Sequence, residues 1–284
     1  MTTNPWRITF VTNPDKCNLA CPLCFLRQKG SSFGMGEMDF GIVETILREY
    51  VPRGLQEVIP STMGEPLLYT HFENLCDLCA ELNLLLNVTT NGTFPVGDVD
   101  YWSYRLFPIS RDIKVSLMGF KPETQSYLMP GIAPDQHRRN LSRLVQVRDE
   151  LKSKNVRTSS VSLQVTVCRK NQMEIQDILN YAASTGVDRV KLNRAIFLDG
   201  CSASLRAELA LPDDAFFTGT TSVPIEGTYV NQVPKLLEKK TCPFMGEELW
   251  VLPDGTFQPC PNPQLRFAEG TWNSKSCEKC PICG

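Results

Sequence analysis

Apolar and polar positions follow two different periods along the first two thirds of the chain. Short strand-like stretches recur, and stretches with apolar residues at helical spacing separate them. The predicted strands cover Arg7–Thr12, Glu57–Pro60, Leu85–Thr89, Asp112–Leu117, Ser160–Val167 and Asp188–Leu192. The predicted helices cover Met38–Val51, Phe72–Leu82, Asp135–Lys154 and Gln172–Ser184, with a helix or irregular stretch over Val96–Leu106.

The order of these elements predicts the fold class. Strands that alternate with helices favour a parallel sheet with right-handed crossovers. We therefore expect an α/β fold in which the strand–helix units form a partial (β/α)6 barrel. In barrels of this type the site lies at the carboxyl ends of the strands.

The pattern changes from Gly200 onward. Phe216–Val230 is rich in Thr, Ser, Gly and Pro and reads as a connector. Glu248–Leu252 and Thr256–Pro259 flank an Asp-Gly turn and predict a β-hairpin. We expect a barrel over 1–195, a connector over 196–240 and a small cysteine-rich hairpin domain over 241–284.

Composition narrows the classes of protein. The chain has 284 residues, 42% of them hydrophobic and 21% charged, which is typical of a globular protein. Its net charge of −2 and scattered basic residues give no reason to expect a nucleic-acid partner. No apolar run spans a bilayer and the start lacks a signal-peptide pattern, so we expect a cytoplasmic protein without a membrane partner.

Cysteines carry the candidate chemistry. Twelve cysteines in a reducing compartment favour metal ligation over disulfides, and two histidines make a His-rich metal centre unlikely. Cys17, Cys21 and Cys24 follow the first strand, without a fourth cysteine at the spacing of a ferredoxin run. Three thiolates hold three corners of an iron–sulfur cube and leave one iron open to a ligand. The alternatives are a zinc knuckle or buried thiols.

This triplet, with Gly64-Glu65-Pro66 after the second strand, resembles the radical S-adenosylmethionine (SAM) superfamily. The resemblance implies a [4Fe-4S] cluster on Cys17, Cys21 and Cys24, with SAM on the open iron. Reductive cleavage of SAM then yields methionine and a 5'-deoxyadenosyl radical, which abstracts a hydrogen from the substrate. One departure is Leu23, where the family often has an aromatic residue.

The resemblance also implies residues that bind SAM. Gly64 and Glu65 match the family's Gly-Gly-Glu-Pro motif, with Met63 in place of its first glycine, and Glu65 would accept from the SAM amino group. Ser116 matches the polar residue near the SAM ribose at the end of strand four. Asn91 is a further expected SAM-binding residue, and Thr166 and Asn193 are weaker candidates. The alternatives are ordinary turn residues and a solvent-facing strand serine.

The C-terminal cysteines form a second group. Cys242 and Cys260 flank the hairpin and resemble the opening of the SPASM and twitch extensions of this superfamily, in which they bind an auxiliary [4Fe-4S] cluster. Further ligands come from Cys277, Cys280 and Cys283, one of which is surplus. One auxiliary cluster, as in the shorter twitch type, fits the number of cysteines better. A structural zinc site is the alternative.

The remaining cysteines and histidines have structural explanations. Cys76 and Cys79 share one face of a predicted helix and are expected to be buried thiols. Single cysteines are expected to be structural, and single histidines to lie at the surface or at helix caps. These residues are Cys168, Cys201, His71 and His137.

The resemblance leaves the substrate open. The leading expectation is dehydrogenation of a small molecule, sugar-like or aminocyclitol-like, with the auxiliary cluster as electron acceptor. The short segment before strand one leaves no room for a leader-binding domain, which mildly favours a small molecule over a ribosomally made peptide. Peptide maturation and a non-enzymatic metal-binding protein are the alternatives. Flavodoxin or ferredoxin is the expected electron donor.

Overall fold

The computed structural model describes residues 4–30, 34–61, 63–198, 200–212, 229–231 and 247–258. It divides into two compact units. The first unit comprises the described residues within Met1–Lys16, Ser32–Asn87 and Pro234–Gly284. The second comprises those within Cys17–Ser31 and Val88–Val233. Strand β3 (Leu85–Thr90) contributes residues to both.

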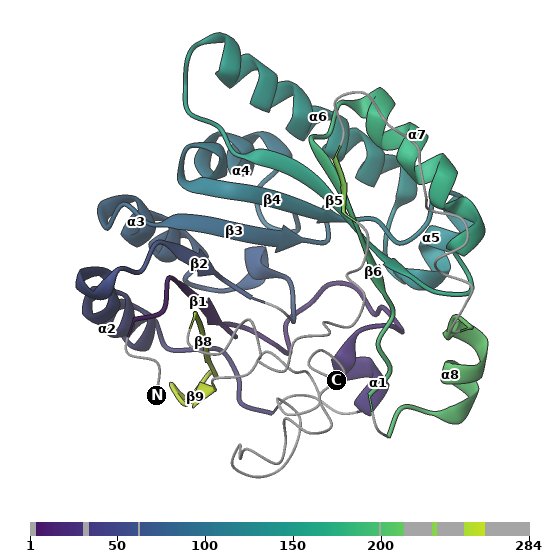
Figure 1. Cartoon of the computed structure of the whole chain (residues 1–284), viewed down its shortest axis with the longest axis horizontal. Helices are drawn as coiled ribbons and strands as arrows, with labels where there is room; N and C mark the ends of the chain where they lie inside the picture. The colour runs from purple at the N-terminus through teal and green to yellow at the C-terminus, as the bar shows by residue number, and fades with distance from the viewer. Residues whose placement is uncertain are drawn as a thin grey trace. The chain divides into compact units, whose positions relative to one another are not determined.

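The strands of the first unit lie in the order β3, β2, β1, β8, β9 (Figure 1). They are β1 (Arg7–Phe10), β2 (Glu57–Ile59), β8 (Glu248–Val251) and β9 (Phe257–Gln258). Ile8 of β1 lies opposite Val58 on one side and Leu249 on the other, in parallel pairing. Among the strands that the structure describes in this unit, β8 and β9 pair antiparallel, as a hairpin.

Two α-helices lie within the described residues of the first unit. They are α2 (Phe40–Tyr50) and α3 (Phe72–Glu81), with short 3-10 turns η1 (Val51–Arg53) and η2 (Pro66–Leu68). Asp39 caps α2 by accepting a hydrogen bond from the Gly41 amide. Helix α2 buries Val43, Ile46 and Leu47, at the spacing of one helix face.

The second unit has strands in the order β7, β6, β5, β4, β3. They are β4 (Ser110–Ser116), β5 (Ser160–Val167), β6 (Arg189–Arg194) and β7 (Tyr229–Asn231), parallel from β4 to β7. The helices are α1 (Phe25–Lys29), α4 (Val99–Leu106), α5 (Pro122–Leu128), α6 (Pro134–Ser153), α7 (Ile175–Thr185) and α8 (Ala203–Leu209). Short turns η3 (Phe107–Ile109) and η4 (Gln172–Glu174) precede β4 and α7.

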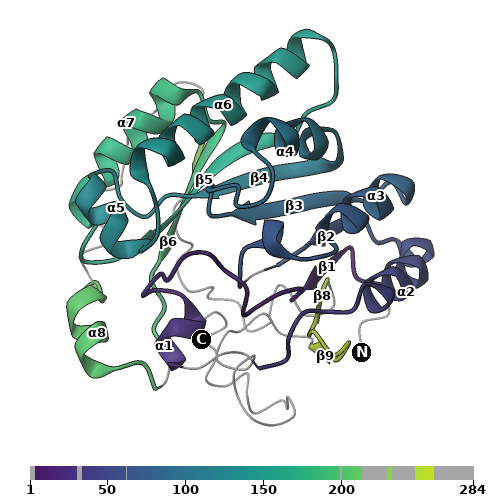
Figure 2. The ribbon, with the colours of Figure 1, turned by 180° about the vertical axis from the view of Figure 1, so that it is seen from behind.

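Helices α4 to α7 lie on one face of the second unit's strands (Figures 1 and 2). Alternate residues of β4, β5 and β6 are buried toward these helices: Ile113, Val115, Val161, Leu163, Val165, Val190 and Leu192. The residues between them face the other way, because side chains alternate along a strand. That opposite face is polar throughout these strands: Asp112, Lys114, Ser116, Ser160, Ser162, Gln164, Thr166, Arg189, Lys191 and Asn193.

The predicted α/β fold with a mostly parallel sheet is confirmed, and so is the hairpin within the C-terminal region. Sequence reasoning missed α5, and it placed Tyr229 inside a connector although β7 pairs with β6 there. It also missed the parallel pairing of β8 with β1, since no local pattern specifies a partner so distant in the chain. Within the described ranges, no helix is both long and apolar enough to cross a bilayer.

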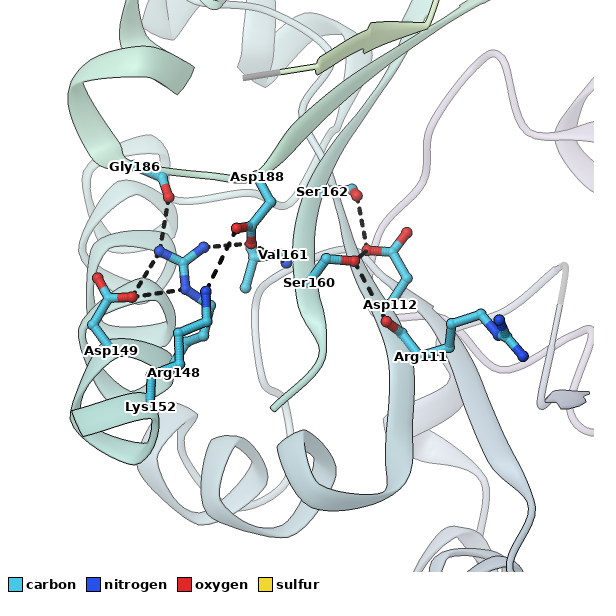
Figure 3. A network of polar contacts seen from close by, with 10 residues as sticks. All are labelled: Arg111, Asp112, Arg148, Asp149, Lys152, Ser160, Val161, Ser162, Gly186 and Asp188. Carbon is cyan, nitrogen blue, oxygen red and sulfur yellow. Dashed lines mark hydrogen bonds and ion pairs between the residues drawn. The ribbon is translucent and has the colours of Figure 1, made fainter. Parts of the chain in front are cut away.

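At the amino-terminal ends of the second unit's strands, charged side chains neutralise one another (Figure 3). The buried guanidinium of Arg148 binds Asp188, Asp149 and the carbonyl oxygen of Gly186. Asp188 also accepts a hydrogen bond from the backbone amide of Val161, at 2.8 Å. This network fastens α6 to the starts of β5 and β6.

Candidate functional site

Cys17, Cys21 and Cys24 lie in the loop between β1 and α1, within the second unit, and none is in a disulfide. Cys17 is exposed and the other two are half-buried. The amide of Cys24 donates to the carbonyl of Cys21 at 3.1 Å, which closes a tight turn around Pro22. The amide of Ala20 donates to the carbonyl of Pro130 at 3.0 Å, so the loop is anchored between its cysteines.

The Cys21 thiol is harder to ionise than an ordinary cysteine side chain. Burial, and then the negative charges of Cys17 and Cys24, raise the pKa of the Cys21 thiol to about 12. Three neighbouring thiolates therefore need a cationic partner, which iron supplies on coordination. In the described part of the chain, no three His, Cys, Asp or Glu residues converge tightly enough for one metal ion. An iron–sulfur cube binds each thiolate through a different iron, so this donor set fits a cluster.

Gly64 and Glu65 lie in the first unit, packed on the loop that precedes Cys17. Gly64 has φ +76°, and a Cβ there would press directly against the carbonyl oxygen of Asn13 and lie 2.8 Å from that of Lys16. The amide of Glu65 donates to the carbonyl of Lys16 at 2.8 Å. The Glu65 side chain is 1% exposed, and its Oε1 accepts from the Leu67 amide at 3.4 Å, at the start of η2.

Sequence reasoning missed Asn13, which organises this turn. Its buried side-chain Nδ2 donates to the carbonyl of Glu65 at 2.7 Å, and its Oδ1 accepts from the Thr12 hydroxyl at 2.8 Å. An Asn-Pro pair directly after a strand is a turn signal that would have drawn attention to it.

Asn91 follows β3 and lies beside the cysteine loop in the second unit. Its Nδ2 is 2.8 Å from Asn18 Oδ1 and 3.9 Å from Cys17 Sγ. Its Oδ1 accepts from both the amide and the hydroxyl of Thr93, at 2.9 and 2.6 Å. Asn18 Nδ2 donates to the Thr93 hydroxyl at 2.9 Å. The side chains of Asn18, Asn91 and Thr93 thus form a closed set of hydrogen bonds next to Cys17.

Ser116, Thr166 and Asn193 lie on the polar face of β4 to β6, near the carboxyl ends of the strands. Ser116 is in register with Gln164, and Thr166 with Asn193. Lys191 is in register with Gln164, so hydroxyl, amide and ammonium groups share one face. Sequence reasoning missed Gln164 and Lys191, although alternation along β5 and β6 places them beside the predicted residues.

The expectation of a surface or capping role for His137 is wrong. Its side chain is 2% exposed, and its Nδ1 lies 3.2 Å from Gln125 Nε2. Burial lowers the pKa of His137 to about 4, and the nearby backbone of Ser116 and Asn91 offsets this only in part. Because the Gln125 amide donates to Nδ1, the neutral ring carries its proton on Nε2, toward the loops after β3 and β4.

Gly92 shows how closely His137 supports the loop after β3. Its φ is +76°, and an added Cβ would lie 2.7 Å from His137 Nε2 and 2.8 Å from Val115 Cγ1. The carbonyl of Gly92 accepts from Asn140 Nδ2 at 2.9 Å. Helix α6 therefore contacts the loop after β3 through the side chains of His137 and Asn140.

The other predicted structural residues fall as follows. Cys76, Cys79 and Cys168 are buried, as expected, and burial raises the pKa of Cys79 well above its ordinary value. Cys201 is half-buried. His71 occupies the cap position of α3, but its side chain makes no capping hydrogen bond. The predicted auxiliary-cluster ligands lie outside the described residues: Cys242, Cys260, Cys277, Cys280 and Cys283.

A model of the radical SAM superfamily matches residues 14–182, which is more than half of the chain. This match covers the cysteine triplet, the Gly64-Glu65 turn and strands β2 to β5. The chain therefore belongs to the radical SAM superfamily. Membership implies SAM and a [4Fe-4S] cluster as the groups that an enzyme of this kind uses.

Two curated relatives share part of the sequence. The chain is 25% identical over 201 residues to the S-adenosylmethionine-dependent nucleotide dehydratase of Thermoplasmatales archaeon (strain ISO4-H5), covering 71% of this chain and 66% of that protein. It is 21% identical over 194 residues to the tungsten-containing aldehyde ferredoxin oxidoreductase cofactor-modifying protein of Pyrococcus furiosus, covering 64% of this chain and 49% of that protein. The chain thus spans less than two thirds of either relative.

Solved structures support the fold. SuiB of Streptococcus suis bound to S-adenosylmethionine superposes with a TM-score of 0.67 at 16% identity, covering 99% of this chain and 72% of that one. SuiB bound to the precursor peptide SuiA superposes with a TM-score of 0.64 at 15% identity, covering 96% and 63%. At these identities the likeness establishes a shared fold.

Proposed function

We propose that this radical SAM enzyme oxidises a small, polar, sugar-like or aminocyclitol-like molecule. The polar face of β4 to β6 is the observation that carries this proposal. A sheet face with hydroxyl, amide and ammonium groups in adjoining rows suits a ligand with many hydrogen-bonding groups. An apolar substrate would cover Ser116, Gln164 and Asn193 without offering them hydrogen-bonding atoms, which costs free energy.

Cys17, Cys21 and Cys24 are the residues that we assign to the cluster, and Gly64, Glu65, Ser116 and Asn91 those that we assign to its SAM site. These residues would hold the cluster and SAM, whose reductive cleavage would supply a 5'-deoxyadenosyl radical able to take a hydrogen atom from a substrate C–H bond. Loss of one further electron and one proton from the substrate would complete a two-electron oxidation.

We assign the second electron to an auxiliary [4Fe-4S] cluster on the C-terminal cysteines, a site of the twitch type. Its predicted ligands are Cys242, Cys260, Cys277, Cys280 and Cys283, one of which is surplus. A flavodoxin or ferredoxin would supply the first electron. Iron and sulfide analysis tests this part: about two cubes per chain support it, and about one cube with one zinc contradicts it.

A nucleotide is the second candidate substrate. The relative named as a nucleotide dehydratase matches 71% of this chain, and the polar face carries the cationic side chain of Lys191 on β6. Cationic side chains on such a face favour phosphate groups. Peptide maturation remains the other enzymatic alternative, but likeness to SuiB at these identities does not favour it over a small molecule.

The first experiment measures SAM cleavage. Anaerobic reconstitution with iron and sulfide, followed by dithionite and SAM, should yield 5'-deoxyadenosine. A fully iron-loaded protein that forms no 5'-deoxyadenosine contradicts the enzymatic function and favours a metal-binding protein.

The second experiment separates the substrate classes. An aminocyclitol set and a nucleoside triphosphate set are compared for stimulation of 5'-deoxyadenosine formation above the substrate-free rate. Lys191→Gln should raise the KM of a nucleotide at least tenfold and leave that of a neutral sugar within about twofold, since a phosphate–ammonium contact is worth about 1.5–3 kcal/mol. Lys152→Gln, an exposed change at the opposite end of the second unit, serves as the control.

A further inference from the structure

We propose that Asn91 tunes the reduction potential of the cluster on Cys17, Cys21 and Cys24 by donating a hydrogen bond to the Cys17 sulfur. The inference rests on the proposed assignment of these thiols as cluster ligands. It gives Asn91 a role on a metal ligand, in addition to the SAM contact that the family resemblance implies.

Two N–H groups point at the sulfur of Cys17. The backbone amide of Leu19 lies 3.4 Å from Cys17 Sγ, and the side-chain Nδ2 of Asn91 lies 3.9 Å from it. Both distances fall in the range of hydrogen bonds to sulfur, which is larger than oxygen. Asn91 is 9% exposed, so water competes little for its amide.

The orientation of the Asn91 amide is fixed by its neighbours. Its Oδ1 accepts two hydrogen bonds from Thr93, which leaves Nδ2 on the other side of the group. That nitrogen lies 2.8 Å from Asn18 Oδ1, an acceptor, and points its second hydrogen toward the sulfur. A donor rather than an acceptor therefore faces the thiolate.

The backbone next to Asn91 is held as well. Asn140 donates to the carbonyl of Gly92, and the buried ring of His137 fills the space below Gly92. The donor is thus positioned before any cofactor binds and pays no ordering cost on binding.

Hydrogen bonds to cluster sulfurs shift reduction potentials. A reduced cluster carries one more negative charge than the oxidised cluster, so an N–H dipole aimed at its thiolate stabilises the reduced form more. Removing the donor should make the midpoint potential more negative. A carboxylate in its place should make it more negative still.

The test is a redox titration of the cluster followed by electron paramagnetic resonance, without SAM. A Cys260→Ala parent removes a predicted ligand of the auxiliary cluster and isolates the N-terminal signal. Asn91→Ala should lower the equilibrium constant for reduction of the cluster at least threefold. This corresponds to a midpoint potential about 28 mV more negative, at ~59 mV per tenfold change for one electron. Asn91→Asp keeps the acceptor for Thr93, and should shift the potential further in the same direction.

The control is Thr93→Val, which removes the hydroxyl contacts of Asn91 and leaves its N–H group, and should move the potential by less than half as much. An Asn91→Asp potential equal to that of the parent shows that only the turn matters and overturns the inference. So does a weaker SAM affinity in equilibrium dialysis with an unchanged SAM-free potential. A parent protein that binds no cluster overturns the proposed function itself, which iron analysis detects separately.

Discussion

The two ends of the strands in the second unit handle charge in opposite ways. At the amino-terminal ends, Arg148 is matched by Asp188 and Asp149, and Asp112 accepts from Ser160 and Ser162 at 2.7 and 2.8 Å. At the carboxyl ends, burial and the neighbouring sulfurs of Cys17 and Cys24 raise the pKa of the Cys21 thiol. The charged groups at the amino-terminal ends are paired within the protein, whereas thiolates at the carboxyl ends would need a bound cationic group to balance their charge.

This difference separates the residues that serve folding from those that serve chemistry. Charges that are paired within the chain stabilise it and offer nothing to a ligand. Groups that are positioned but unfavourable together, such as the cysteine thiols, indicate a site.

The largest expected effect comes from Cys17→Ala at the carboxyl end. Removing one of the proposed cluster ligands should lower SAM cleavage to background, because the cluster is not held by two thiolates. The measurement is 5'-deoxyadenosine formation together with bound iron. Cys201→Ala is the control and should retain both; full activity of Cys17→Ala would refute the ligand assignment.

The next effect concerns pH. The pKa of His137 is about 4 in the folded protein against 6.5 for the ordinary side chain. The unfolded state binds the proton more readily, so stability is complete above pH 6.5 and falls as the pH drops toward 4. The loss reaches about 3 kcal/mol at ~1.36 kcal/mol per pKa unit.

Urea unfolding of the wild type and of His137→Gln across this pH range tests that expectation. The variant lacks the titrating group and should show a flatter dependence between pH 6.5 and 4. Parallel curves for the two proteins would show that other groups dominate acid unfolding.

Two glycines, one at each end of the strands, should differ in the stability that is lost when they are replaced by alanine. Gly92 at the carboxyl end and Gly186 at the amino end both have positive φ, of +76° and +82°. A Cβ added at Gly92 would press against His137 and Val115. A Cβ added at Gly186 would lie 3.6 Å from Val145, an ordinary van der Waals distance. Gly186→Ala should cost about 1 kcal/mol of conformational strain, and Gly92→Ala about 2 kcal/mol more from overpacking.

Thermal unfolding and iron content of both glycine variants provide the measurement. Only Gly92→Ala should also lower cluster loading, because its loop carries Asn91. Equal losses of stability would mean that His137 and Val115 yield to the added methyl group.

The smallest effect is expected at the amino end. Asp188→Asn keeps the acceptor for the Val161 amide and removes the charge that faces Arg148. We expect a loss of about 1.5 kcal/mol in the free energy of unfolding, since Asp149 and the Gly186 carbonyl remain. Lys152→Met, 3.8 Å from Asp188 and exposed, should cost at most about 0.5 kcal/mol. SAM cleavage should be unchanged in both variants. A loss of SAM cleavage would contradict the assignment of the amino-terminal ends to folding alone.

Much of the fold was readable from the sequence because its strands and long helices carry strong periodicity. The prediction for Ser160–Val167 matches β5 in both bounds. Helix α5 was missed because seven residues are too few to show a period. β8 itself was predicted, but its partner β1 was not, because pairing across more than two hundred residues leaves no local signal.

The sequence predicts candidate site residues where chemistry fixes residue type and spacing, as in the cysteine triplet, whose role as ligands stays a prediction. It does not predict residues whose surroundings depend on neighbours that are distant in the chain. His137 has no partner pattern in the sequence, since Gln125 lies on another helix. Gln164 and Lys191 carry no motif, and only the register of β4 with β5 and of β5 with β6 brings Gln164 beside Ser116 and Lys191 beside Gln164.

The pairing of β8 with β1 has a consequence for biosynthesis. The ribosome makes β8 more than two hundred residues after β1, yet the amide of Val11, at the start of the cysteine loop, donates a hydrogen bond to the carbonyl of Val251 at 2.8 Å. Until translation reaches β8, one edge of β1 lacks its strand partner and is open to pairing with other chains. The strand that leads into the cysteine loop therefore gains its second neighbour only after more than two hundred further residues have been made.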